Sequence, residues 1–189
     1  MPTFEPPDPD FQSAVRQSFE RLTLMKTIGA SLERVSPGEV EVRLPFRNDL
    51  TQHHGFMAAA VLTAVVDVAC GYAAMSLMPP GSSVLTIEFK ANFLAPAQGE
   101  RMIARGRVIR PGRTLTVCAG DVVAVDGGQE TIVATLLTTM MLVTGERPLA
   151  TATSSAPGRH RSVAHSRGIR KWCVCRAWKG RRNGAAALV

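Results

Sequence analysis

The chain has 189 residues, enough for a single domain with a sizeable core. Hydrophobic residues make up 46% and charged residues 20%, a composition that excludes a wholly disordered chain, a collagen-like chain and, with four cysteines, a disulfide miniprotein. The net charge of +7 comes from the C-terminal part, because residues 1–144 carry 12 basic and 14 acidic side chains, whereas residues 145–189 carry 10 basic and one acidic. The first 144 residues therefore give no reason to expect nucleic-acid binding.

The N-terminal region predicts a helix followed by two strands. Residues 1–10 are rich in Pro and Asp and predict a loose leader, with neither the basic nor the apolar region of a signal peptide. Residues 11–25 predict an amphipathic helix, and residues 25–35 and 39–46 predict strands. The apolar residues at helical spacing are Phe11, Val15, Phe19 and Leu22.

Residues 57–77 contain a single charge, Asp67, and their length and alanine content predict a helix that ends before Pro79. It is apolar on all sides, so it is either buried all round or spans a membrane. Asp67 would cost roughly 3 kcal/mol near the middle of a bilayer, and no basic cluster flanks the segment closely. We therefore expect no membrane span.

Four further strands are predicted over residues 84–94, 101–110, 114–125 and 131–143. In the first of them apolar and polar residues alternate. The short connectors carry turn residues suited to hairpins and predict an antiparallel meander. An antiparallel sheet of about five to six strands wrapped around one long helix, an α+β fold, would bury both the helix and the apolar strand faces.

Residues 145–189 lack apolar periodicity and predict a basic, disordered tail. A nucleic-acid-binding arm and a segment never shaped by selection are the alternatives. Cys173 and Cys175 have no second Cys or His cluster at zinc spacing, so we expect no metal site there. Cys70 and Cys118 lie inside apolar runs, as buried reduced thiols do, and indicate a reducing, cytoplasmic environment.

Asp67 is the main candidate functional residue, because aspartate is rarely buried without a partner. A structural role, with the carboxylate satisfied by an N–H group, a hydroxyl or an arginine across an interface, is one interpretation. The other is a catalytic carboxylate in a cleft, whose pKa partial desolvation would raise, making it a better base near neutral pH.

The sequence resembles the hotdog-fold acyl-CoA thioesterases of the PaaI type over about residues 11–144. The segments that carry the resemblance are Gln52-His53-His54-Gly55-Phe56, residues 67–74, residues 85–97 and Arg110-Pro111-Gly112-Arg113-Thr114. It implies a hotdog domain over residues 1–144 that hydrolyses acyl-CoA to a free acid and CoA. It also implies a homodimer or tetramer, and no metal or cofactor apart from the CoA of the substrate.

The family's His-Gly-Gly motif is altered in this chain. Its His stands nine residues before the aspartate, where this sequence has Ala58, followed by Ala59 and Ala60. Gln52 matches the family's amide residue, six positions earlier. His54-Gly55 resembles the motif but stands thirteen residues before Asp67, so His54 is either a polar loop residue at the mouth of the site or a displaced histidine.

The resemblance assigns roles to the matching residues. Asp67 is the general base or the nucleophile, and Thr86 positions Asp67 or the water. The N–H group of Ala59 and the amide of Gln52 hold the oxyanion, since a helix N-terminus offers free N–H groups. Further substrate contacts are expected from Gly55, Ala58, Ala60, Lys90 and Arg113. The last two are candidates for the CoA phosphates or ordinary solvated charges.

Ala58 keeps the main-chain donor but removes an imidazole. The chain could therefore be a slow thioesterase, a variant with other donors, or a non-catalytic domain that binds acyl-CoA or lipid. A hydratase lacks support because no Asp–His pair is evident.

The spacing of Ala59 and Asp67 predicts a dimer. They are eight residues apart, and so lie about 12 Å apart along one helix. One thioester cannot easily contact both, whereas two antiparallel helices bring one chain's N-terminus beside the other chain's aspartate. We expect strands 84–94 of two chains to meet at their edges.

Overall fold

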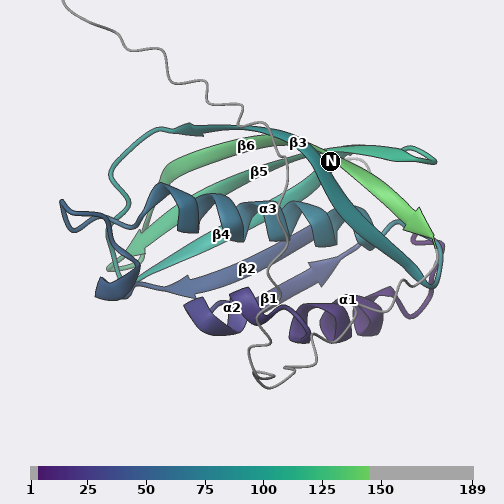
Figure 1. Ribbon diagram of the computed structural model, residues 1–189, viewed down its shortest axis with the longest axis horizontal. Helices are drawn as coiled ribbons and strands as arrows, with labels where there is room; N and C mark the ends of the chain where they lie inside the picture. The colour runs from purple at the N-terminus through teal and green to yellow at the C-terminus, as the bar shows by residue number, and fades with distance from the viewer. Residues whose placement is uncertain (1–3, 145–189) are drawn as a thin grey trace, which may run out of the picture. The chain divides into compact units, whose positions relative to one another are not determined.

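The computed structural model describes residues 4–144, so the predictions for the basic tail and for Cys173 and Cys175 lie outside the described residues. Figure 1 shows one helix, α3, lying across a face of the sheet, with α1 and α2 beside β1. The elements are α1 (Phe11–Glu20), α2 (Thr23–Ile28), β1 (Ser31–Ser36), β2 (Glu39–Pro45), a 3-10 turn (Asn48–Leu50), α3 (Ala59–Met75), β3 (Ser82–Phe93), β4 (Arg101–Arg110), β5 (Leu115–Asp126) and β6 (Gln129–Thr144).

The six strands form one antiparallel sheet in the order β1-β2-β4-β5-β6-β3. The predicted sheet around one long helix is confirmed, but the simple meander is wrong at β3. The connector after β3 bonds first to β6, through the Leu94 N–H and the Val133 carbonyl (2.8 Å), and then to β5, through the Glu100 N–H and the Val125 carbonyl (2.8 Å). It thereby passes both strands before β4 begins, and leaves β3 at the sheet edge.

Two glycines let α3 approach the sheet closely. A Cβ atom on Gly106 of β4 would lie 2.3 Å from the carbonyl carbon of Ala69, and one on Gly120 of β5 would lie 2.6 Å from a methyl group of Val66. A side chain at either position would push the helix away, so these glycines fix the middle of α3, where Asp67 lies. The side of α3 that faces the sheet belongs to a core whose largest fully buried side chains are Met25, Leu44, Met102, Leu136 and Met140.

The expectation that α3 is buried on every side is wrong. Ala59 and Ala60 are exposed, and Thr63 and Asp67 are half-buried, along a face that the sheet does not cover. No helix within residues 4–144 is long and apolar enough to cross a membrane.

The predicted strand over residues 25–35 is also partly wrong, because its first residues belong to α2. Met25 and Ile28 are both buried, and residues three apart share a face on a helix but not on a strand. Gly29, with φ at 76°, ends the helix in the left-handed conformation that glycine adopts readily. The strand β1 then begins at Ser31.

Candidate active site

Asp67 and Thr86 form the polar pair at the centre of the uncovered face of α3. The Thr86 hydroxyl donates a hydrogen bond of 2.9 Å to Oδ1 of Asp67, while Oδ2 has no hydrogen-bond partner among residues 4–144. Partial burial raises the pKa of the Asp67 carboxyl above its ordinary value, and the Thr86 hydrogen bond opposes that rise. The pair holds one carboxylate oxygen and leaves the other available.

A β-bulge in β3 places Thr86 beside Asp67. Thr86 pairs with Met140 of β6, Glu88 pairs with the adjacent Thr139, and Ile87 is the extra residue between them. The expected strict alternation is therefore interrupted. Thr86 lies on the same side as Phe89, facing α3, instead of on the side of Glu88.

The two cations proposed for CoA binding are not near Asp67 within the chain. Lys90 pairs with Leu137 on the side of β3 that faces away from α3, and Arg113 lies exposed in the turn between β4 and β5. No salt bridge is formed by either side chain within residues 4–144. The structure does not bring these two predicted residues together with the carboxylate.

The start of α3 presents main-chain donors. The N–H of Ala58, the N-cap residue, donates to the Leu50 carbonyl at 3.0 Å. The N–H groups of Ala59 and Ala60 have no acceptor within residues 4–144. Two free N–H groups at the positive end of a helix can bind a developing negative charge.

The loop before α3 holds Gln52 in a defined orientation. The Oε1 atom of the Gln52 side chain accepts a hydrogen bond from the backbone N–H of His54. The backbone N–H of Gln52 donates to the Phe56 carbonyl at 2.8 Å. Gly55 turns the loop at a φ of 83°, where a side chain would be strained. With Oε1 engaged, the two N–H donors of the Gln52 amide remain available.

The two halves of the predicted site lie well apart in one chain. Asp67 is eight residues beyond Ala59 in α3, a rise of about 12 Å. Within one chain, the Asp67 carboxylate and the Thr86 hydroxyl therefore lie far from the N–H donors at the start of α3.

The strand beside Asp67 has one unpaired side and carries exposed apolar side chains. β3 is an edge strand, so one row of its backbone groups has no partner strand within residues 4–144. Four of its large apolar side chains are about half exposed: Leu85, Ile87, Phe89 and Phe93. A long edge with such side chains is typical of a surface that another chain covers.

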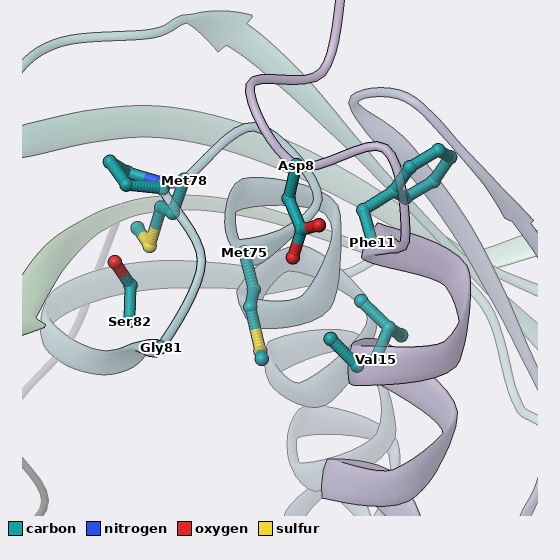
Figure 2. Close-up of a pocket in the computed structure, with 9 residues that line it drawn as sticks. Asp8, Phe11, Val15, Met75, Met78, Gly81 and Ser82 are labelled. Carbon is teal, nitrogen blue, oxygen red and sulfur yellow. The ribbon is translucent and has the colours of Figure 1, made fainter.

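Two cavities of the described residues lie away from Asp67. Figure 2 shows the first, where Asp8, Val15 and Met75 surround a space between α1 and the end of α3. Its volume of about 20 Å³ is room for about one water molecule. The second, of about 230 Å³, lies beside Phe4 and Arg107. Residues 4–144 contain no group of three side chains suited to hold a metal ion.

Comparison with known proteins identifies the family. The family model of the thioesterase superfamily matches residues 54–131. A Halobacterium salinarum protein that carries an esterase name is 33% identical over 122 residues, which cover 61% of this chain and 80% of that protein. The chain belongs to the thioesterase superfamily.

Solved structures of this superfamily share its fold. A thioesterase family protein from Silicibacter pomeroyi is 47% identical, with a TM-score of 0.70 over 71% of this chain and 99% of the other. Escherichia coli PaaI is 18% identical, with a TM-score of 0.65 over 72% and 95% of the two chains. The hotdog fold predicted from the sequence is thus confirmed for this thioesterase-superfamily chain.

Two features of the site were not predicted from the sequence: the bulge at Ile87 and the bond between Gln52 and His54. The bulge depends on strand pairing, and the bond from the His54 N–H to the Gln52 side chain depends on the conformation of the loop. The adjacent threonines of β6, Thr138 and Thr139, are the one signal for the bulge, because both hydroxyls bond to Glu88.

Proposed function

We propose that this chain hydrolyses acyl-CoA thioesters to a free acid and CoA. The observation that carries the proposal is the Asp67–Thr86 pair, a half-buried carboxylate with one oxygen held by a hydroxyl, on the central helix of a thioesterase-superfamily fold. The reaction needs no metal or redox cofactor, and CoA enters only as part of the substrate.

Asp67 acts from Oδ2, since Thr86 holds Oδ1. It either takes a proton from the water that attacks the thioester carbonyl, or attacks that carbonyl itself and forms a mixed anhydride that water then opens. In both routes the C–S bond breaks, and CoA leaves as a thiolate that takes up a proton. Both routes need the ionised carboxylate. Because burial raises the pKa of Asp67, hydrolysis falls as the pH falls through that raised value.

The oxyanion is held by the start of α3. We assign the oxyanion to the N–H group of Ala59 and the amide N–H of Gln52, which have no acceptor within residues 4–144, with Gly55, Ala58 and Ala60 shaping the loop around it. This binding relies on main-chain groups, which alanine retains, and lacks an imidazole at Ala58. We infer a slower hydrolase than one with a histidine at this position.

The working unit we propose is a homodimer, able to form a tetramer, in a cytoplasmic setting that keeps Cys70 and Cys118 reduced. The unpaired edge and half-exposed apolar side chains of β3 favour pairing with a second β3. Antiparallel α3 helices would then bring the Ala59 end of one chain to Asp67 of the other, completing two sites. Lys90 and Arg113 remain proposed contacts for the CoA phosphates, and in the dimer either chain could supply them.

The test is thiol release from a panel of acyl-CoA esters, measured with a thiol dye. We expect turnover by the wild-type chain and almost none by Asp67→Asn. Asp121→Asn is the matched control, because Asp121 pairs with Arg107 at 2.8 Å elsewhere in the sheet. Turnover of no ester, or equal turnover by Asp67→Asn, would reject the proposal.

Ala58 favours a second function, a non-catalytic domain that binds acyl-CoA or a lipid. Titration calorimetry with the same esters separates the two. Binding without thiol release, unchanged in Asp67→Asn, would establish the binding domain instead of the enzyme.

A further inference from the structure

The bulge in β3 determines which side chain meets Asp67. In a regular strand Thr86 would share a side with Glu88 and point away from α3, and an apolar neighbour would face the carboxylate. The extra residue at Ile87 reverses this, so that Thr86, Phe89 and the following helix-facing residues lie on one side. The hydrogen bond to Asp67 thus depends on the bulge.

A buried hydroxyl bonds to the backbone at the bulge. Thr138 pairs with Phe89 across the ladder, yet its hydroxyl donates to the backbone carbonyl of Glu88 at 2.8 Å. Thr138 is only 2% exposed, so this carbonyl is the partner that keeps its hydroxyl satisfied. The neighbouring Thr139 also donates to Glu88, but to the side-chain Oε1 atom (2.8 Å), on the side away from α3.

We propose that Thr138 is a positioning residue that holds the bulge at Ile87 and, through it, the Thr86 hydroxyl against Asp67. The inference rests on the role proposed for Asp67 in hydrolysis. Thr138 acts through the backbone of Glu88 and through Thr86, and touches neither the carboxylate nor the substrate.

Among the groups around Asp67, the Thr86 hydrogen bond is the contact with the carboxylate that should respond to a substitution at Thr138. On β3 the charged residues, Glu88 and Lys90, lie on the side away from α3. The β6 residues that face α3 across from β3 are Ala134, Leu136, Thr138 and Met140, none of them titratable. On α3 itself the neighbouring titratable group is Cys70, and on β5, which packs against α3, it is Cys118; burial raises the pKa of both thiols, so both are neutral.

The test compares Thr138→Ser with Thr138→Ala, which both lack the methyl group and differ only in the hydroxyl. The pKa of Asp67 is followed by NMR titration of its carboxyl carbon, assigned with Asp67→Asn. We expect Thr138→Ser to keep the wild-type value and Thr138→Ala to raise it by about half a pH unit or more, because a hydrogen bond to the ionised form is lost. Thr139→Val, the control, should keep the wild-type value.

The pKa of Asp67 is then measured for Thr138→Ser and Thr138→Ala in a Thr86→Val background, where residue 86 has no hydroxyl for Thr138 to position. There the Ser and Ala variants should titrate alike. Equal values in the parent background, or a difference that persists without Thr86, would overturn the inference. Should Thr138→Ala fail to fold, the isosteric Thr138→Val, compared with wild type, decides by the same criteria.

The titration needs no turnover, so the two proposals fail separately. Absence of acyl-CoA hydrolysis by the wild-type chain rejects the proposed function. A hydroxyl-independent pKa at Asp67 rejects the positioning role. If hydrolysis occurs, the acid limb of kcat/KM should move to higher pH in Thr138→Ala but not in Thr138→Ser or Thr139→Val.

Discussion

The middle and the start of α3 contribute to the candidate site in different ways. In the middle, the proposed chemistry belongs to a side chain, because Asp67 is held by Thr86 and positioned by the close packing at Gly106 and Gly120. At the start, we assign the chemistry to the main chain, through the N–H groups of residues 59 and 60, which have no acceptor among residues 4–144. Side-chain chemistry is lost with one substitution, whereas main-chain chemistry survives many. On the proposed function, this difference would account for Ala58 standing where the resemblance to the PaaI type implies a histidine.

The largest expected contrast between the two regions comes from Asp67→Asn and Gln52→Ala. Asp67→Asn should lower kcat at least ~100-fold, the range for a lost acid–base group. Gln52→Ala should cost only about 10-fold, because the N–H of Ala59 still serves the oxyanion. Steady-state kinetics measure both, with thermal unfolding to verify the fold. Equal losses would remove the distinction between the regions, and an unfolded Asp67→Asn chain would indicate a structural role for the carboxylate.

Introducing a histidine at position 58 tests the start of α3 by a gain of activity instead of a loss. Ala58→His should raise kcat/KM by about 10-fold if an imidazole adds one more donor to the main-chain groups. Ala58 is only partly buried and its N–H bond to Leu50 is a backbone bond, so the helix start should survive. No gain in a folded variant that binds acyl-CoA would show that the main chain already supplies what the site needs.

A smaller effect is expected from Thr86→Val in the middle of the helix. The Thr86 hydrogen bond lowers the pKa of Asp67, so its loss raises that pKa further. Since the ionised form is required, the acid limb of the kcat/KM profile should move to higher pH, with a loss of several-fold on that limb and little change at pH values above it. A profile that moves to lower pH, or does not move, contradicts the role given to the hydroxyl.

The smallest effect is expected outside both regions. A chain ending at Thr144 should keep its fold and its hydrolysis, because every residue assigned to the site lies before that point. Its formal net charge would change from +7 to −2. Circular dichroism and the thiol assay check this, and a loss of either property would place the domain boundary further along the chain.

The sequence predicted those parts of the fold that local pattern determines. The strand over residues 101–110 and the helix containing Asp67 lie where composition and turns placed them. The helical turn at Met25–Ile28 and the position of β3 beside β6 were missed. Both depend on what the segment packs against, which no local pattern records.

The candidate site could likewise be predicted only in part from the sequence. Asp67 could be predicted from one charge in an apolar helix, and Thr86 from resemblance. The bulge that turns Thr86 toward Asp67 arises from the pairing of β3 with β6, so alternation within β3 alone predicted it wrongly. Lys90 and Arg113 were chosen for charge alone, and the structure places neither beside the carboxylate within one chain.

Mixing two inactive variants tests the shared site most directly. Asp67→Ala removes the carboxylate, and Ala59→Pro removes the N–H group at the start of α3. Each homodimer should be inactive, and a heterodimer should recover one intact site, because one chain keeps Asp67 and the other keeps the Ala59 donor. Recovered hydrolysis, up to about half the wild-type activity per heterodimer, is the expected result. No recovery despite verified folding and chain exchange, or a monomer in solution, would contradict a site shared between two chains.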